Sequence, residues 1–230
     1  MAAVLRVSEV FDSLQGEGPS AGLPATFLRL ALCNLRCGYC DTKYTWDWQS
    51  FRYEEQVRAV EVPSLAPRLA AASGERLIIT GGEPLVQLKA LERLLPLLPS
   101  VIAIEVETNG TLRPSASLLA RVTQWNVSPK LGNSGQSESD RLNMDALACL
   151  RDSGRAWLKF VVGDRADCEE AQQLALRCEW PRERVSLMPL ASSRAEHALR
   201  APLIAAQALT RKLGYSPRLH IELWDGQRGV

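Results

Sequence analysis

Three cysteines near the start of the chain are spaced like the ligands of a metal centre. Cys33, Cys37 and Cys40 are separated by three residues and then by two, so one loop can direct all three sulfur atoms at a single inorganic group. A structural zinc ion takes four ligands, usually with a second close pair of Cys or His, and His197 and His220 do not form such a pair. Three thiolates suit a [4Fe–4S] cluster in which one iron lacks a protein ligand and can bind a small chelating molecule.

The other three cysteines, Cys149, Cys168 and Cys178, have no closely spaced partner. A secreted disulfide scaffold is typically short, with cysteines distributed throughout, whereas here half of them lie in one loop. We therefore predict one cluster and no second metal centre.

Short apolar segments alternate with longer helical patterns, and these elements must position the cysteine loop. Strands are predicted at residues 25–32, 76–80, 101–107, 125–128, 157–162 and 185–189, with a further short strand at 218–224. Helices are predicted at about residues 54–72, 88–98, 115–121, 164–178 and 194–213. The polar segment 131–139 is predicted to be a loop.

This alternation predicts parallel βαβ units with right-handed crossovers, and therefore an α/β fold. About six parallel strands are too few to close an eight-stranded barrel. We therefore expect a partial, open parallel β/α barrel formed by a single domain, residues 1–230. The C-terminal strand and tail, about residues 218–230, are expected to close its unpaired side.

Ligands of such folds bind where the strands end. Four predicted strands run into segments of interest: Gly81-Gly82-Glu83-Pro84, Glu107-Thr108-Asn109-Gly110, Ser128-Pro129-Lys130 and Met188-Pro189-Leu190-Ala191. Paired glycines let a backbone approach a ligand closely. Asn-Gly and Ser-Pro also mark ordinary turns, so both interpretations remain open from the residues alone.

The cysteine loop resembles the signature loop of radical S-adenosylmethionine (SAM) enzymes, including the aromatic Tyr39 before the last cysteine. The resemblance implies that SAM chelates the free iron and that an electron from the reduced cluster yields a 5′-deoxyadenosyl radical, chemistry that belongs to the cofactor. It also implies SAM contacts from the loop and the strand ends: Tyr39, Cys40, Asp41, Gly82, Glu83, Glu107, Ser128, Pro129, Lys130, Met188, Pro189, Leu190 and Ala191.

The N-terminal region narrows the resemblance further. The motif Phe11-Asp12-Ser13-Leu14-Gln15-Gly16-Glu17-Gly18 precedes Phe27-Leu28-Arg29-Leu30 and then Cys40-Asp41-Thr42. This combination resembles the 7-carboxy-7-deazaguanine synthase family, and the resemblance extends to the terminal Arg228-Gly229-Val230. It implies a radical ring contraction of 6-carboxy-5,6,7,8-tetrahydropterin to 7-carboxy-7-deazaguanine. Ammonia is lost and SAM is regenerated, on the route to 7-deazapurines such as queuosine.

The residue chemistry suits a carboxylated pterin. Arg29 offers a bidentate fork for a carboxylate, although it could instead be a surface ion-pair partner. Glu17 can accept from ring N–H groups, and Gln15 can both accept and donate. The substrate residues implied by the resemblance are Leu14, Gln15, Gly16, Glu17, Arg29, Thr80, His220 and the terminal carboxylate of Val230.

A magnesium ion is also implied, and Thr42 supplies a hard oxygen of the kind that Mg²⁺ prefers. Thr42 could instead cap a helix. Two other functions remain open: an activase for a glycyl-radical enzyme, which would need a protein partner, and a non-catalytic zinc-stabilised binding module.

Composition limits the partners. The chain has 230 residues, of which 46% are hydrophobic and 23% charged, with a formal net charge of +1, so no bulk field favours nucleic acid or an anionic membrane. No leader segment or apolar run of about 20 residues is present. We expect a cytoplasmic enzyme, homodimeric, reduced by an electron donor such as flavodoxin or ferredoxin.

Overall fold

The computed structural model describes residues 3–71 and 75–230. Within these residues, nine strands form one curved sheet in the order β3-β1-β2-β4-β5-β6-β7-β8-β9. The strands from β2 to β9 run parallel, while β1 is antiparallel to both β2 and β3. The strands are β1 Val4–Leu14, β2 Pro24–Leu30, β3 Arg58–Glu61, β4 Arg76–Gly81, β5 Ala103–Thr108, β6 Gln124–Val127, β7 Ala156–Val162, β8 Val185–Pro189 and β9 Gly214–Tyr215.

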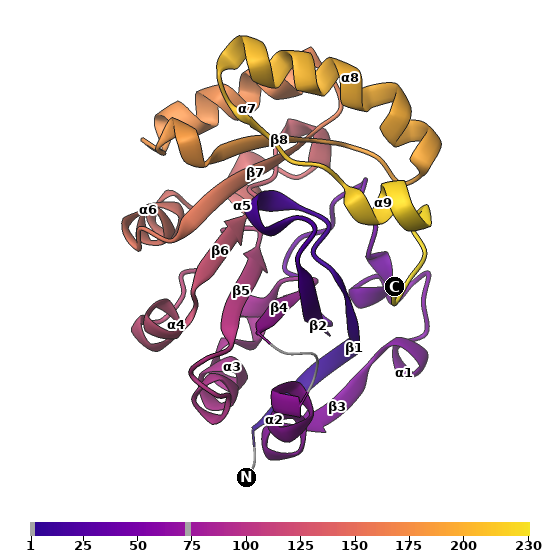
Figure 1. The fold of residues 1–230 in the computed structure, drawn as a ribbon, viewed down its shortest axis with the longest axis vertical. Coiled ribbons are helices and arrows are strands. Elements are labelled where there is room, and N and C mark those ends of the chain that lie inside the picture. The colour runs from indigo at the N-terminus through magenta and orange to yellow at the C-terminus, as the bar shows by residue number, and fades with distance from the viewer. Residues whose placement is uncertain (1–2, 72–74) are drawn as a thin grey trace.

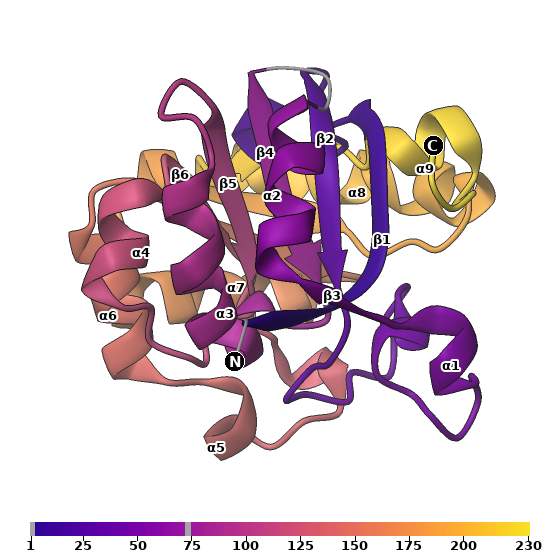
Figure 2. The same cartoon turned by 90° about the horizontal axis from the view of Figure 1, so that it is seen from below.

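Most of the helices cover the outer, convex face of this sheet, while α1 and α9 lie at its open side (Figure 1). The helices of the described residues are α1 Tyr53–Gln56, α2 Val62–Ala71, α3 Leu88–Leu94, α4 Ala116–Arg121, α5 Glu138–Arg141, α6 Met144–Asp152, α7 Arg165–Arg177, α8 Arg194–Arg211 and α9 Leu219–Trp224. Seen from below, α9 and the C-terminus lie on the side of the molecule opposite α4 and α6 (Figure 2). The predicted open, partial β/α barrel is therefore confirmed.

Local sequence explains where the outer helices begin. Ser115, Asn143, Asp164 and Ser193 each occupy the N-cap position, and each side chain accepts a hydrogen bond from a backbone N–H of the first turn. These short polar side chains satisfy donors that otherwise lack a partner at a helix start. The helices that follow β5, β6, β7 and β8 therefore each begin at a capping residue encoded in the local sequence.

The two faces of the sheet differ in chemistry, as β5 illustrates. Ile104 and Val106 are fully buried and belong to the apolar core beneath the helices. Glu105 and Glu107 alternate with them and point to the concave interior, because successive strand residues face opposite sides. Glu105 is itself fully buried and bonded to Ser20, Gln124 and Asn126. The concave interior is thus polar, and this is the side available to ligands.

Two predicted elements are wrong. The predicted strand 218–224 is instead helix α9, Leu219–Trp224 with Arg218 at its N-cap, and the edge strand beside β8 is the two-residue β9. In the helix Ile221 is buried and Leu223 is 46% exposed; the alternating apolar residues, which suggested a strand, do not share one buried face. In a segment this short, periodicity does not discriminate helix from strand.

The predicted helix 54–72 is also wrong in its first part. Residues 53–56 form α1, residues 58–61 form β3 against β1, and α2 begins at Val62. Ala72, its predicted end, lies outside the described residues. The sequence reading missed β1, which is 11 residues long, and α6. Segment 131–139 contains a 3₁₀ turn and the start of α5. No helix in the described ranges is long and apolar enough to cross a membrane.

Candidate active site

A cavity of about 360 Å³ is lined by residues at the carboxyl ends of the parallel strands, among them Thr80, Glu107 and Ser128. Most of the residues singled out from the sequence line it. They are Leu14, Gln15, Gly16, Glu17, Arg29, Cys33, Cys37, Tyr39, Cys40, Asp41, Thr42, Thr80, Gly82, Glu107, Ser128, Lys130, Met188, Leu190, His220 and Val230. Four others, Glu83, Pro129, Pro189 and Ala191, are buried beside the cavity without lining it.

The cysteine loop, residues 33–42, borders this cavity, and Cys33, Cys37 and Cys40 all line it. It begins after Leu32, a non-glycine residue with φ of 74°, a strained conformation of the kind that accumulates at functional sites. The backbone N–H of Leu35 lies 3.4 Å from Sγ of Cys33, and the indole Nε1 of Trp46 lies 3.3 Å from Sγ of Cys40. Donors aimed at sulfur stabilise thiolates and tune clusters, so the donor set fits a [4Fe–4S] cluster.

Burial and a nearby cation have opposite effects on the pKa values of Cys33 and Cys37. Burial raises the pKa of Cys33 to about 11, and the ammonium of Lys130 opposes part of that rise. Metal loading must therefore displace a proton from Cys33 at neutral pH, and the metal itself supplies the charge that makes this favourable. Lys130 also donates to Oγ of Ser128 at 3.1 Å, and both residues line the cavity together with the three cysteines.

The double glycine after β4 packs against the cysteine loop rather than against empty space. A Cβ on Gly82 would lie 2.7 Å from the carbonyl carbon of Leu32 and 3.0 Å from Cβ of Cys33. Gly81 has φ of 133°, and a Cβ there would meet the backbone of Leu30. The N–H groups of Gly82 and Glu83 donate to the carbonyls of Leu30 and Leu32. The glycines thus let β4 continue its pairing into the start of the cysteine loop.

The carboxylate of Glu83 forms hydrogen bonds with other residues of the chain. It is fully buried and accepts from the backbone N–H of Asn109 at 2.7 Å, the hydroxyl of Thr108 at 2.9 Å and the N–H of Leu85 at 3.0 Å. Burial raises its pKa, and these three hydrogen bonds oppose the rise. Glu83 therefore ties the end of β4 to the end of β5, and its predicted contact with SAM remains a prediction.

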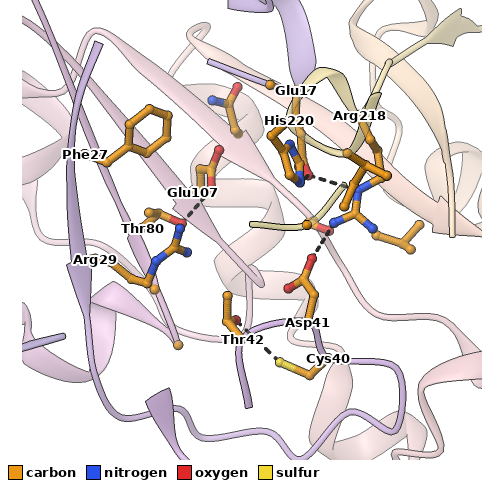
Figure 3. A pocket seen from close by; sticks show the side chains of 18 of the residues that line it. Glu17, Phe27, Arg29, Cys40, Asp41, Thr42, Thr80, Glu107, Arg218 and His220 are labelled. Atoms are coloured by element: carbon orange, nitrogen blue, oxygen red, sulfur yellow. Dashed lines mark hydrogen bonds and ion pairs between the residues drawn. The ribbon is translucent and has the colours of Figure 1, made fainter. Parts of the chain in front are cut away.

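Glu107 lies among the residues predicted for substrate. Thr80 donates to one carboxylate oxygen at 2.6 Å, and the amide of Gln15 donates to the other at 3.2 Å. Arg29 and Phe27 are on the same side of the cavity (Figure 3). Glu107 was predicted to contact SAM, but its hydrogen-bond partners, Thr80 and Gln15, are residues predicted for substrate.

Arg29 is fixed by a residue that the sequence reading missed. Its Nε donates to Oε2 of Glu9 at 2.7 Å, and the same oxygen accepts from the hydroxyl of Tyr44 at 3.0 Å. The guanidinium lies 5.5 Å from the ring of Phe11, which stacks on Phe27 with centroids 5.0 Å apart. Arg29 is thus pre-oriented beside two parallel aromatic rings.

Glu17 occupies the opposite side, within the segment of residues 15–20 that we call the strap. One of its oxygens pairs with Lys159 of β7, and the other lies 3.3 Å from Nε of Arg218. Burial alone would raise the pKa of Glu17, but Lys159 and Arg218 outweigh it and hold that pKa well below its usual range. Arg218 also pairs with Asp41 of the cysteine loop (Figure 3).

The C-terminal tail, residues 225–230, closes over the same cavity. Ser13 donates to the terminal residue Val230 at 2.5 Å. Arg228 stacks on Tyr44 at 3.5 Å and lies 3.0 Å from Glu9. His220 lines the cavity next to the strap: a Cβ on Gly16 would overlap its ring, so only glycine fits there. Burial lowers the pKa of His220, which favours the neutral imidazole.

Sequence reasoning therefore missed several cavity residues: Phe11, Phe27, Tyr44, Trp46, Lys159, Arg218 and Arg228, as well as Glu9, which fixes Arg29. For Lys159 a signal existed, because a lysine within an otherwise apolar strand needs a buried partner. Arg218 gave no such signal, since charged residues before a chain end are ordinarily solvated.

The comparisons agree with this geometry. The radical SAM superfamily model matches residues 30–143. A curated relative from Pyrobaculum aerophilum, named 7-carboxy-7-deazaguanine synthase, is 40% identical over 98% of this chain and 97% of its own. A relative of the same name from Hyperthermus butylicus is 38% identical over 95% of this chain and 92% of its own.

Solved structures include chains with a similar fold. QueE from Escherichia coli superposes with a TM-score of 0.66 at 25% identity, covering 94% of this chain and 95% of that one. SuiB from Streptococcus suis, bound to precursor peptide SuiA, has a TM-score of 0.55 at 15% identity and covers 80% of this chain and 46% of its own, which shows the fold alone. These matches do not favour the activase or the zinc-module alternative.

Proposed function

The chain belongs to the 7-carboxy-7-deazaguanine synthase family of radical SAM enzymes, and on that premise we propose that its cavity contracts the ring of 6-carboxy-5,6,7,8-tetrahydropterin with release of ammonia. Such a reaction makes the enzyme a carbon–nitrogen lyase. The observation that carries the proposal is one cavity that holds three free cysteines on one side and a guanidinium with two carboxylates, Arg29, Glu17 and Glu107, on the others.

Cys33, Cys37 and Cys40 would hold the [4Fe–4S] cluster, and Ser128 and Lys130 would bind SAM beside it. When bound, the cluster and SAM supply a hydrogen-abstracting 5′-deoxyadenosyl radical. The chain's own task is to place the substrate and to exclude water.

Arg29 would bind the pterin carboxylate through its two Nη atoms, because Nε is already bonded to Glu9. A guanidinium held in this way loses little conformational freedom when it forms a bidentate pair. Glu17 is ionised and Glu107 accepts from Thr80 and Gln15, so both can accept from the N–H groups of the pterin. The Phe11–Phe27 pair would flank the flat ring system.

Thr42 is the residue we propose for Mg²⁺. Its hydroxyl lies 3.6 Å from Sγ of Cys40 and is only partly buried. No side-chain cap hydrogen bond occupies that hydroxyl at the 3₁₀ turn that follows, which argues against the helix-cap alternative. Mg²⁺ commonly takes few protein ligands and completes its shell with substrate and water, so a single threonine suffices on the protein side.

We further propose a cytoplasmic homodimer that receives electrons from a flavodoxin- or ferredoxin-like donor. A low-potential donor is needed because reductive cleavage of SAM consumes one electron from the cluster. The exposed Arg36 of the cysteine loop stacks at 4.9 Å on the half-exposed Trp46, which follows the loop, so the donor can approach the cluster from this face.

The test is direct. Anaerobically reconstituted, reduced protein is incubated with SAM, Mg²⁺ and the carboxytetrahydropterin, and 7-carboxy-7-deazaguanine and ammonia are measured. We expect equal amounts of both and no net loss of SAM. Zinc without iron or sulfide would support the binding module, and activity that requires a glycyl-radical protein partner would support the activase.

A further inference from the structure

Arg218 is a buried cation placed where three functional segments meet. It is 4% exposed and forms the N-cap of α9, which follows the edge strand β9 in the chain. Arginine is almost never fully buried unless its charge is paired, so a buried arginine at a chain end requires a partner. The partners of Arg218 lie up to 201 residues away in the sequence, a separation of 218 minus 17.

Each nitrogen of its guanidinium contacts a different segment of the chain. Nη1 donates to the carbonyl of Ala191, in the loop after β8. Nη2 donates to the carboxylate of Asp41, between the last cluster cysteine and Thr42. Nε lies 3.3 Å from Oε1 of Glu17 in the strap. The planar fork thus contacts a predicted SAM segment, the cysteine loop and a predicted substrate segment at once.

Residues next to Arg218 form hydrogen bonds with the strap on both sides of Glu17. The N–H of Leu219 donates to the carbonyl of Gly16 at 2.9 Å. The N–H of Gly18 donates to the hydroxyl of Ser216 at 2.8 Å. A displacement of Arg218 therefore moves the strap, and a displacement of the strap moves Arg218.

The charges are balanced only when all of these segments are in place. Glu17 pairs with Lys159 as well as with Arg218, whereas Asp41 has its ion pair with Arg218. If either loop moves away, Arg218 keeps a buried charge with one partner fewer, which is costly in a low-dielectric interior. The network thus favours conformations in which the strap and the cysteine loop are ordered together.

We propose that Arg218 is a positioning residue that couples substrate binding at the strap to SAM binding at the cysteine loop, through Glu17 and Asp41. This inference rests on the proposed function. Occupation of either site orders its own loop, and the shared guanidinium transmits that order to the other loop. Linkage makes the effect reciprocal: SAM raises the affinity for the pterin by the same factor as the pterin raises the affinity for SAM.

The experiment measures that factor in the reconstituted full chain. The probe is 6-carboxypterin, a fluorescent analogue that lacks the hydrogen on C6 and cannot react. Its dissociation constant is measured with and without saturating SAM, and the ratio is the coupling factor. We expect a factor of about fivefold or more for the native protein, close to one for Arg218→Gln, and an intermediate value for Arg218→Lys, which retains the charge but not the fork.

A second variant tests the other end of the network. Asp41→Asn removes the charge on the cysteine loop and leaves Arg218 in place, so it lowers the coupling factor without an orphaned carboxylate. The double variant Arg218→Gln/Asp41→Asn should lower the factor no further than either single change, because both remove the same interaction. Arg200→Gln is the matched control: Arg200 donates to the neighbouring carbonyl of Leu190 at 2.8 Å and should keep the native factor.

The outcomes separate the two proposals. Iron content and thermal unfolding identify variants that have not folded, and Asp41→Asn with Arg218→Lys then carries the test. A native protein that binds SAM but not the carboxypterin overturns the proposed function and this inference with it. A native protein that binds both with a factor near one, or an Arg218→Gln variant within about twofold of the native factor, overturns the coupling role alone.

Discussion

Gly82 provides a prediction about the cysteine loop that needs no assumption about the reaction. Its φ is ordinary for an L-residue, so alanine introduces no backbone strain there, and the effect of Gly82→Ala is steric. The new Cβ would lie 2.7 Å from the carbonyl carbon of Leu32 and 3.0 Å from Cβ of Cys33, and closer still to the Leu32 oxygen. Leu32 already has a positive φ, so its backbone has little room to move away.

The size of the effect follows from these distances. Carbon atoms in contact are ordinarily separated by about 3.5–4.0 Å, so the carbonyl carbon of Leu32 must retreat by about 1 Å. Overpacking of this kind typically costs about 1–3 kcal/mol, and a rigid backbone neighbour places Gly82→Ala at the upper end. For a chain of this size, about 3 kcal/mol lowers the melting temperature by about 6–12 °C. Because Leu32 leads into Cys33, iron loading should fall as well.

The assay compares metal-free melting temperatures first and iron and sulfide contents second. The control is Gly38→Ala, inside the cysteine loop itself, where the nearest atom to a new Cβ, apart from the chain neighbours, is the carbonyl oxygen of Ser134 at 3.9 Å. We expect native metal-free stability for Gly38→Ala. If Gly82→Ala melts within about 2 °C of it, a difference that corresponds to under about 1 kcal/mol, the packing argument is refuted.

Other predictions concern the ligands. Alanine variants of Cys33, Cys37 and Cys40 should lose iron and SAM cleavage, whereas alanine at Cys149, Cys168 and Cys178 should preserve both; the reverse pattern would overturn the cluster assignment. Glu9→Gln replaces a charge-assisted bond to Arg29 by a neutral one worth about 1–1.5 kcal/mol less, so the KM for the carboxypterin should rise about tenfold with kcat little changed. Thr42→Ala should weaken pterin binding more than SAM binding and abolish stimulation by Mg²⁺; equal activity in chelator and in magnesium would contradict this. A short extension beyond Val230 should raise the KM for the pterin, and an unchanged KM at unchanged stability would make the tail purely structural.

The parallel part of the fold could be predicted because each of its elements carries a local signal. The strands of the sheet's centre carry apolar residues on the face covered by the helices, and several crossover helices begin at a capping Ser, Asn or Asp. Strand β8 was predicted at its observed bounds, Val185–Pro189. The cysteine loop follows from spacing alone, since ligands that close in sequence need no tertiary information to meet.

The edges of the fold could not be predicted for a physical reason. Strand β1 has a burial pattern of mostly half-exposed residues, because one side faces the cavity, so its sequence is neither continuously apolar nor cleanly alternating. Strand β3 has four residues and α9 has six, both shorter than the window in which periodicity can be measured. Both elements are held by contacts with residues distant in the sequence: β3 pairs with β1, and α9 is bonded to the strap.

The polar interior follows the same logic and explains why Lys159 and Arg218 escaped notice. Whether a charged residue can be buried on the concave face depends on partners that are distant in the sequence. Glu17 pairs with Lys159, 142 residues away, and Asp41 pairs with Arg218, 177 residues away. Composition counts such residues as surface charge, yet both are buried. An interior of paired charges is costly to assemble, and it is retained where it holds polar groups in fixed orientations toward a ligand. The ion pairs of the buried Lys159, Arg218 and Glu105 therefore mark the concave face as the working side of the sheet, independently of any motif.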